Sequence, residues 1–155
     1  MAQAGTETTL QFVINPYLGG LSINVPTNGT FTSIESPDTD TVISTMLDTV
    51  TVTDKRRDSL NLTWTTNAVS TNFITGVDTL TADTIGYSAG PATLLLGLAG
   101  VTEFTQTALN VPIRVQAGAT LTGKHIVSWR PTLRMPVPYN KPPGTYTARL
   151  THSVF

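Results

Sequence analysis

The chain alternates apolar and polar residues in short runs, and a period of two is the pattern of half-buried β-strands. The alternation is clearest near the end of the chain. Apolar positions there fall two apart on both sides of a turn-rich stretch, at Leu133, Met135 and Val137 before it and at Tyr146, Ala148, Leu150, His152 and Val154 after it. Prolines and a glycine between Pro136 and Gly144 disfavour helix. The pattern predicts a hairpin within residues 129–155 that closes the domain.

The same alternation predicts strands earlier in the chain. Apolar positions two apart place strands at residues 10–14 and 21–25, and each run ends in residues that form turns, so that the two could pair as a first hairpin. A long strand is predicted from Val42 towards Asp54. Its turn at residues 54–58 leads into a strand through Trp64, which predicts a second hairpin.

The middle of the chain is less regular. Short apolar runs occur at residues 73–74, 85–87, 94–98 and 111–115. Beyond one short turn near residues 79–84, no window has the 3.6-residue period of a helix, so the helix content should be very low. The run Leu94-Leu95-Leu96-Gly97-Leu98 does not alternate, and both of its sides must therefore be covered. A central strand is favoured, and an apolar loop tip that needs a partner is the alternative.

Many short strands with turns between them predict an all-β fold, an immunoglobulin-like antiparallel β-sandwich. About thirty threonines are spread along the chain, and their branched side chains favour the pleated sheet. Trp64 and Trp129 lie within predicted strands and are expected in the core, with sugar stacking as the alternative. The length of 155 residues and the lack of an internal repeat favour a single domain over residues 1–155.

Composition makes several classes of function improbable. Charged residues make up 12% of the chain and the net charge is −1, which leaves no electrostatic footprint for nucleic acid or an anionic membrane. The absence of cysteine excludes disulfides, thiolate metal sites and a cysteine nucleophile. The most apolar run, residues 89–101, is well short of the ~20 residues that span a bilayer, so no membrane segment is expected. Ala2-Gln3-Ala4 is similar to the stub left by signal-peptide cleavage, which favours an extracellular location.

Two blocks that together cover residues 50–155 resemble the WxL-type surface domains of secreted proteins of Gram-positive bacteria. The first is Val50-Thr-Val-Thr-Asp54-Lys-Arg56, followed by Trp64 and by Ser70-Thr-Asn-Phe73. The second contains Trp129-Arg-Pro-Thr-Leu, Gly144-Thr-Tyr-Thr-Ala and Leu150-Thr-His-Ser-Val. The family's Trp-x-Leu repeats read here as Trp64-Thr-Thr and His152-Ser-Val, and the ending is more similar to divergent WxL-like proteins of actinobacteria.

The resemblance implies a β-sandwich exposed at the cell surface, with non-covalent attachment to peptidoglycan in the family's characterised members. It also implies a structural role for the residues that match the family's motifs, which are Asp54, Arg56, Trp64, Trp129, Gly144, Tyr146 and His152. The loss of the Trp-x-Leu repeats bears on wall binding more than on the fold.

Few residues are candidates for chemistry. Asp54, Arg56 and Asp58 share one predicted turn, where a carboxylate can pair with the guanidinium group and hold the hairpin; a small cation or glycan site is the alternative. Asp38 and Asp40 could begin a calcium loop, but the spacing lacks further oxygen ligands. These spacings favour structural pairing over a metal site.

The histidines favour structure over catalysis. His152 is in register with the core face, where a neutral imidazole bonded to a backbone carbonyl is expected. The only other histidine is His125, so a three-histidine metal site is impossible, and the chain contains no Gly-x-Ser-x-Gly elbow. We therefore assign no catalytic, cofactor-binding or metal-binding residue and expect a protein that is not an enzyme.

Tyr17 and Tyr139 lie in predicted loops and are candidates for an exposed contact with glycan or protein. Two functions fit the sequence. One is a non-enzymatic cell-surface module that attaches to peptidoglycan or another surface polymer or protein. The alternative is a homo-oligomeric structural subunit that polymerises into a fibre or surface layer through strand edges, to which the segment Thr6 to Ile14 could contribute by pairing with a neighbouring subunit. Pairing of that segment within its own chain is the default.

Overall fold

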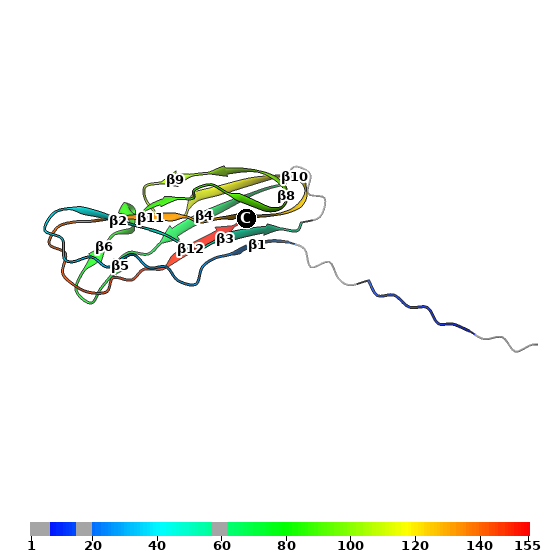
Figure 1. Cartoon of the computed structure of the whole chain (residues 1–155), viewed down its shortest axis with the longest axis horizontal. Coiled ribbons are helices and arrows are strands. Elements are labelled where there is room, and N and C mark those ends of the chain that lie inside the picture. Colours follow the sequence, from blue (N-terminus) through cyan, green and yellow to red (C-terminus); the bar gives the residue numbers. More distant parts are fainter. Residues whose placement is uncertain (1–6, 15–19, 57–61) are drawn as a thin grey trace, which may run out of the picture.

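The fold is built from antiparallel β-sheets in the computed structural model, which describes residues 7–14, 20–56 and 62–155 (Figure 1). The larger sheet pairs its strands in the order β1 (Leu21–Asn24), β3 (Val50–Asp54), β10 (Ile113–Trp129), β4 (Thr63–Ser70) and β12 (Leu150–Val154), and β8 (Thr93–Glu103) also pairs with β10. The second sheet has the order β2 (Thr41–Met46), β11 (Thr132–Val137), β7 (Gly86–Ser88) and β9 (Thr105–Gln106). The all-β prediction is confirmed.

The remaining elements are short. β5 (Phe73–Ile74) pairs with β6 (Thr79–Leu80), and η1 (Ala82–Thr84) is a single turn of 3-10 helix that falls within the predicted turn near residues 79–84. Among the described residues, no helix is long and apolar enough to cross a membrane. The prediction of very low helix content is confirmed for this part of the chain.

The long strand β10 organises the larger sheet. Its first part pairs with β4, its last part pairs with β3, and β8 pairs along both parts. The strands at the two ends of the pairing order, β1 and β12, come into contact with each other, so the sheet curls strongly. This curvature encloses the core between the larger sheet and the second sheet.

The core follows the alternation of the strands. Buried and partly buried residues alternate along β3, with Val50 and Val52 fully buried. Leu133, Met135 and Val137 of β11 face the same core. Trp64 and Trp129 are 1% and 2% exposed, which confirms the prediction that both tryptophans are core residues.

The predicted closing hairpin is wrong. β11 lies in the second sheet and β12 lies in the larger sheet, so the two apolar ladders do not pair. Both edges of β11 are already occupied, one by β2 and the other by β7. The proline-rich residues 138–149 therefore cross between the sheets instead of reversing within one.

The long strand predicted from Val42 towards Asp54 is in fact two strands in different sheets. β2 ends at Met46, and β3 begins at Val50 in the larger sheet. The Leu47 N–H donates to the carbonyl of Pro131, which continues the pairing of β2 with β11 by one residue before the chain passes to the larger sheet. The predicted second hairpin is also wrong, because β3 pairs with β1 and β10 and does not pair with β4.

The predicted strand at residues 10–14 is absent. Residues 7–14 form no strand, and they extend away from the domain as a separate tail (Figure 1). Residues 21–24 do form a strand, but β1 pairs with β3 and not with the tail. Leu10, Phe12 and Ile14 are 88%, 84% and 83% exposed. The predicted hairpin between residues 10–14 and 21–25 is therefore wrong, because the apolar face of the tail contacts no surface of its own domain.

The central strand predicted for residues 94–98 is wrong as well. β8 pairs with β10 on one edge only, and no other described strand pairs with its outer edge. Leu94, Leu95, Leu96 and Leu98 are between 38% and 59% exposed. The apolar run therefore forms an edge strand, although its sequence is that of a covered one.

Candidate functional site

Asp54 and Arg56 form a bidentate ion pair at the end of β3. The Arg56 Nε donates to Asp54 Oδ1 at 2.9 Å, and Nη2 donates to Oδ2 at 2.7 Å and to the Thr63 carbonyl at 2.9 Å. Burial alone would raise the pKa of Asp54, but the hydrogen bonds from the Arg56 side chain and backbone N–H outweigh it and lower the pKa. The predicted structural pairing is confirmed for these two residues, while Asp58 lies outside the described residues.

Replacing Arg56 by methionine is expected to lower the free energy of unfolding by about 2 kcal/mol, because the buried Asp54 carboxylate loses both guanidinium bonds and, among the described residues, retains the hydrogen bond from the backbone N–H of residue 56. Urea denaturation at neutral pH measures the change. Because folding lowers the pKa of Asp54, the ion pair contributes fully to the free energy of unfolding above the ordinary pKa of an aspartate. The contribution disappears as the pH falls through the pKa that Asp54 has in the folded protein.

Lys55→Met is the matched control for the Arg56 substitution, because Lys55 is the exposed neighbouring cation. We expect its effect to stay within about 0.5 kcal/mol. Equal losses in the two variants would show that the ion pair adds no stability.

A second polar contact lies inside the core. The indole N–H of Trp64 donates to Nε2 of His125 at 2.8 Å, and both side chains are buried. Because Nε2 accepts this bond, the ring carries its proton on Nδ1. Gly118 lies opposite Trp64 in the sheet, and a β-carbon there would overlap the indole ring. Trp64 is thus held by a hydrogen bond at its edge and by glycine backbone beneath it.

A third polar chain joins the two sheets. The Trp129 indole N–H donates to the Tyr87 hydroxyl at 3.1 Å, and that hydroxyl lies 2.9 Å from Nε2 of His152. Burial raises the pKa of Tyr87 and lowers that of His152 to about 4, so both groups are neutral at pH 7. The prediction of a neutral His152 on the core side of its strand agrees with this arrangement, but its partner is the tyrosine hydroxyl and not the expected backbone carbonyl.

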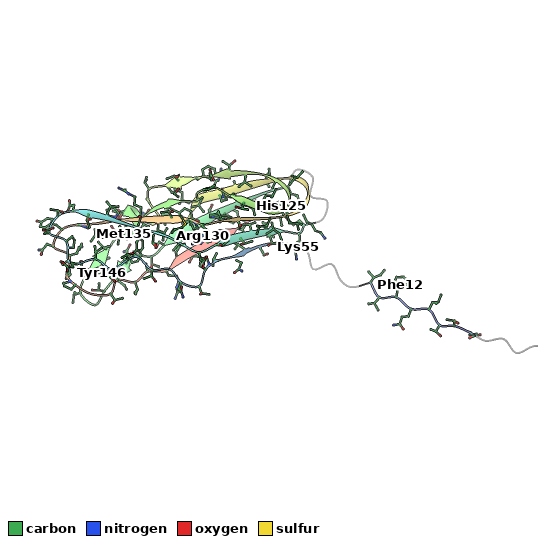
Figure 2. The ribbon with its side chains drawn as sticks, viewed as in Figure 1. Phe12, Lys55, His125, Arg130, Met135 and Tyr146 are labelled. Atoms are coloured by element: carbon green, nitrogen blue, oxygen red, sulfur yellow. The ribbon has the colours of Figure 1, made fainter. Side chains whose placement is uncertain are left out.

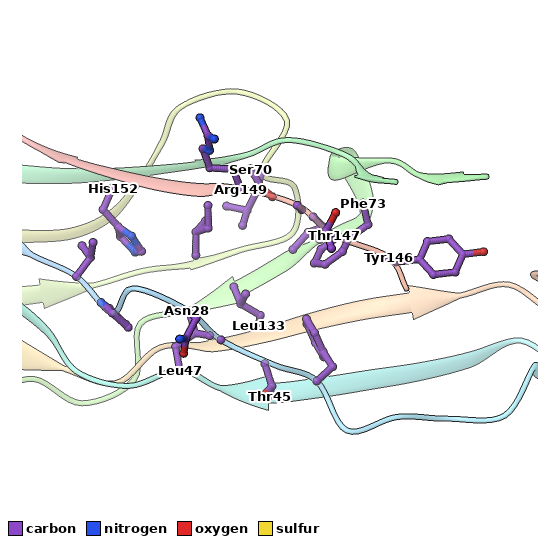
Figure 3. Close-up of a pocket in the computed structure, with 18 of the residues that line it drawn as sticks. Asn28, Thr45, Leu47, Ser70, Phe73, Leu133, Tyr146, Thr147, Arg149 and His152 are labelled. Carbon is purple, nitrogen blue, oxygen red and sulfur yellow. The ribbon is translucent and has the colours of Figure 1, made fainter. Parts of the chain in front are cut away.

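Two adjoining grooves open along one side of the molecule. The smaller has a volume of about 390 Å³ and is lined by residues from Val25 to Phe31 and from Tyr146 to Leu150, with His152 projecting from β12 towards it (Figure 3). The larger has a volume of about 700 Å³ and lies between residues 29–37 and 141–147. Phe31, Phe73 and Tyr146 line both grooves, so together they form one continuous surface feature.

The larger groove combines an apolar floor with hydroxyl-rich walls. Ile43, Met135 and Val137 form part of the floor. The walls carry the hydroxyl-bearing side chains of Thr30, Thr32, Ser33, Ser36, Thr145, Tyr146 and Thr147. Glu35 also lines the groove, and the other charged lining residue, Lys141, is paired with Asp78. The remaining polar lining is uncharged, which suits a polar polymer with few charges.

An ion pair lies at the margin of the larger groove. Lys141 Nζ is 3.0 Å from Asp78 Oδ2, and the hydroxyl of Tyr146 is 3.0 Å from the same oxygen. The hydrogen bond from Lys141 is the main cause that lowers the pKa of Asp78. The positive charge of Lys141 is therefore balanced by the Asp78 carboxylate. Gly144 also lines the groove and lies beside Thr75.

The other predicted positions are placed as follows. Tyr139 is 63% exposed, as the loop prediction requires, and it lies between Val137 and Lys141, which both line the larger groove. Tyr17 lies outside the described residues. Asp40 accepts a hydrogen bond from the Tyr139 backbone N–H at 2.9 Å, which gives it a structural role. Within the described residues, no three histidine, aspartate or glutamate side chains gather as a metal site.

The sequence prediction missed the role of His125. His125, Val127 and Trp129 are spaced two apart and are all buried, so the alternation could have placed this histidine on the core face. The groove was missed because it is formed by two irregular segments that have no alternation of their own.

A scan against family models found no match for this chain, and searches of curated proteins and of solved structures also found none.

Proposed function

We propose that this chain is a non-catalytic module of the bacterial cell surface, with an immunoglobulin-like sandwich, that holds a surface polymer in its larger groove, for which the uncharged glycan strand of peptidoglycan is the candidate. The observation that carries the proposal is the groove itself, whose volume of about 700 Å³ is in the range of ligand sites and whose walls are rich in hydroxyl groups. The resemblance of residues 50–155 to WxL-type domains supports the choice of polymer.

The recognition would combine stacking with hydrogen bonds. Tyr139 offers an exposed aromatic ring in the chain segment between Val137 and Lys141, which both line the groove, and such rings provide large amphipathic contact faces. The polar groups of the core support a non-catalytic role, since His125, Tyr87 and His152 are bonded to other core side chains. The low net charge supports contact recognition without electrostatic steering.

Replacing Tyr139 by alanine is expected to weaken binding to purified cell wall by about 5- to 10-fold, because one aromatic contact contributes about 1 kcal/mol. The measurement is co-sedimentation of the full chain with insoluble wall, with albumin as the background protein. Phe155→Ala is the matched control, since Phe155 is 64% exposed and, unlike Tyr139, is not within two residues of any position that lines the larger groove. Lack of enrichment of the unmodified chain over albumin would contradict the proposal. Equal losses of wall binding in both variants would show that the wall does not contact the protein at the groove.

The second candidate function is a structural subunit that polymerises through strand edges. A specific observation favours it: β8 exposes its outer edge and its leucines together. Low net charge leaves little repulsion between copies.

A further inference from the structure

We propose that residues 7–14 of one copy of this chain add as a strand to the free edge of β8 in a second copy. The inference rests on the second candidate function above, and it names both the donor and the acceptor. Neither surface overlaps the larger groove. Wall binding and self-association can therefore be tested separately.

The acceptor is an edge strand without the usual protection. β8 is 11 residues long and pairs only with β10 among the described strands. Edge strands are normally protected by charges or prolines, yet residues 93–102 contain neither. The pairing of β8 with β10 shifts register at three places. Gly97 lies at one of them and adopts φ +73°, at a point where a β-carbon would meet Lys124 and His125. Free backbone groups and exposed leucines thus lie together along one accessible edge.

The donor is an apolar segment without a partner in its own domain. Residues 7–14 contain one charge, Glu7, and alternate so that Leu10, Phe12 and Ile14 share one face of an extended chain. Figure 2 shows Phe12 on this tail, away from the rest of the molecule. The three side chains are 83% to 88% exposed, which is costly in water unless another surface covers them.

The two surfaces match in length and chemistry. Eight extended residues span about 26 Å, which is shorter than an 11-residue strand, so the length of β8 accommodates the whole segment, with an irregular step at Gly97. Backbone hydrogen bonds would provide affinity, and contacts between the tail's apolar face and the β8 leucines would provide specificity. Since donor and acceptor are different surfaces of the same chain, the association is head-to-tail and each added copy presents a new free tail. The expected product is a linear chain of copies.

The test uses two double substitutions in the full chain, each of which damages one surface. Leu10→Lys/Phe12→Lys removes the donor, and Leu95→Lys/Leu96→Lys removes the acceptor. Val77→Lys/Val111→Lys adds the same two charges at exposed apolar positions outside both surfaces. Sedimentation velocity over a range of concentrations measures self-association. We expect concentration-dependent growth for the unmodified chain and the control, and a loss of about 100-fold or more in the association constant for the donor and acceptor variants.

Mixing the two damaged variants gives the decisive result. The donor variant retains an intact β8 and the acceptor variant retains an intact tail, so the mixture should form a one-to-one dimer that does not grow further. Pairing of β8 with β8, or of tail with tail, would give no such dimer. Hydrogen exchange should slow at residues 7–14 and 93–103 as the unmodified chain is concentrated, and this measurement decides the matter if the acceptor variant is less stable.

Each other result has a definite meaning. A chain that stays monomeric at every concentration would overturn both this inference and the polymerising subunit. Growth that persists in the donor variant, or a mixture that stays monomeric while the unmodified chain grows, would overturn the tail-to-edge contact and leave polymerisation through another edge.

Discussion

Replacing Gly118 by alanine is expected to lower the free energy of unfolding by about 3 kcal/mol, because the new methyl group would occupy space that the Trp64 indole already fills. An ideal β-carbon at position 118 would overlap Cε2, Cζ2 and Nε1 of that ring. The ring cannot move aside freely, since its N–H donates to buried His125. Chemical denaturation monitored by tryptophan fluorescence measures the loss.

Gly100→Ala is the matched control for this substitution. Gly100 lies on β8, in register with Ala119 of β10, next to Gly118. A β-carbon at position 100 would meet no atom within 4 Å, so the change should stay within about 0.5 kcal/mol. Similar losses at both glycines would show that strand flexibility and not the indole contact determines the effect. Combining Gly118→Ala with Trp64→Phe should cost less than the sum of the two single losses, because the smaller ring relieves the overlap.

The faces of the strands could be predicted from sequence because alternation is a local property. Val50 and Val52 of β3, and Leu133, Met135 and Val137 of β11, are buried as their spacing requires. Side chains on a strand point alternately to opposite faces wherever that strand is placed. The prediction therefore holds for burial even where the assignment of the strand's partner is wrong.

The pairing of the strands could not be predicted in the same way, because it depends on contacts far apart in sequence. The predicted second ladder begins at Tyr146, but β12 begins only at Leu150, so the connection from β11 is longer than predicted and spans residues 138–149. Its turn-rich composition is compatible with a hairpin and also with a crossover between sheets. The structure has a crossover, since β2 and β7 occupy both edges of β11. The composition of the connection contains no information about those two neighbours.

The run at residues 94–98 illustrates a different limit. Its composition predicts a central strand, and the structure has a strand there, but one that pairs with β10 alone and whose leucines are not covered by the described part of the chain. The exposed apolar edge of β8 and the exposed apolar tail are both explained if the tail of one copy covers the β8 edge of another. Both apolar segments are visible in the sequence, but only the structure shows that they do not pack against each other within one chain.

The polar contacts of the candidate site differ in the same way: those between residues close in sequence could be predicted, and those between distant residues could not. The Asp54–Arg56 pair joins residues two apart, so its spacing is visible in the sequence. The Trp64–His125 bond joins residues 61 apart, and the Tyr87–His152 bond joins residues 65 apart. These long-range polar bonds connect strands whose pairing or packing the sequence did not reveal, and they are the contacts that fix the aromatic core.

Acidification from pH 7 to pH 4 is expected to lower the free energy of unfolding by roughly 3 kcal/mol through His152 alone. Burial lowers the pKa of this imidazole to about 4, while an unfolded histidine titrates near 6.5. Between these values the unfolded chain binds the proton and the folded chain does not. The contribution is therefore fully present above about pH 6.5 and disappears as the pH falls towards 4.

Urea midpoints measured at several pH values test this expectation, and an NMR titration of the His152 ring reports its pKa directly. His152→Gln keeps an acceptor for the Tyr87 hydroxyl but cannot take up a proton, so it should flatten the dependence between pH 6.5 and 4. Tyr87→Phe is the informative control: it removes the hydrogen bond and preserves the apolar surroundings, and because burial is the cause of the lowered pKa, the slope should remain. A slope that survives in His152→Gln would assign the acid sensitivity to another group. A slope lost in Tyr87→Phe would make the hydrogen bond, and not burial, the cause.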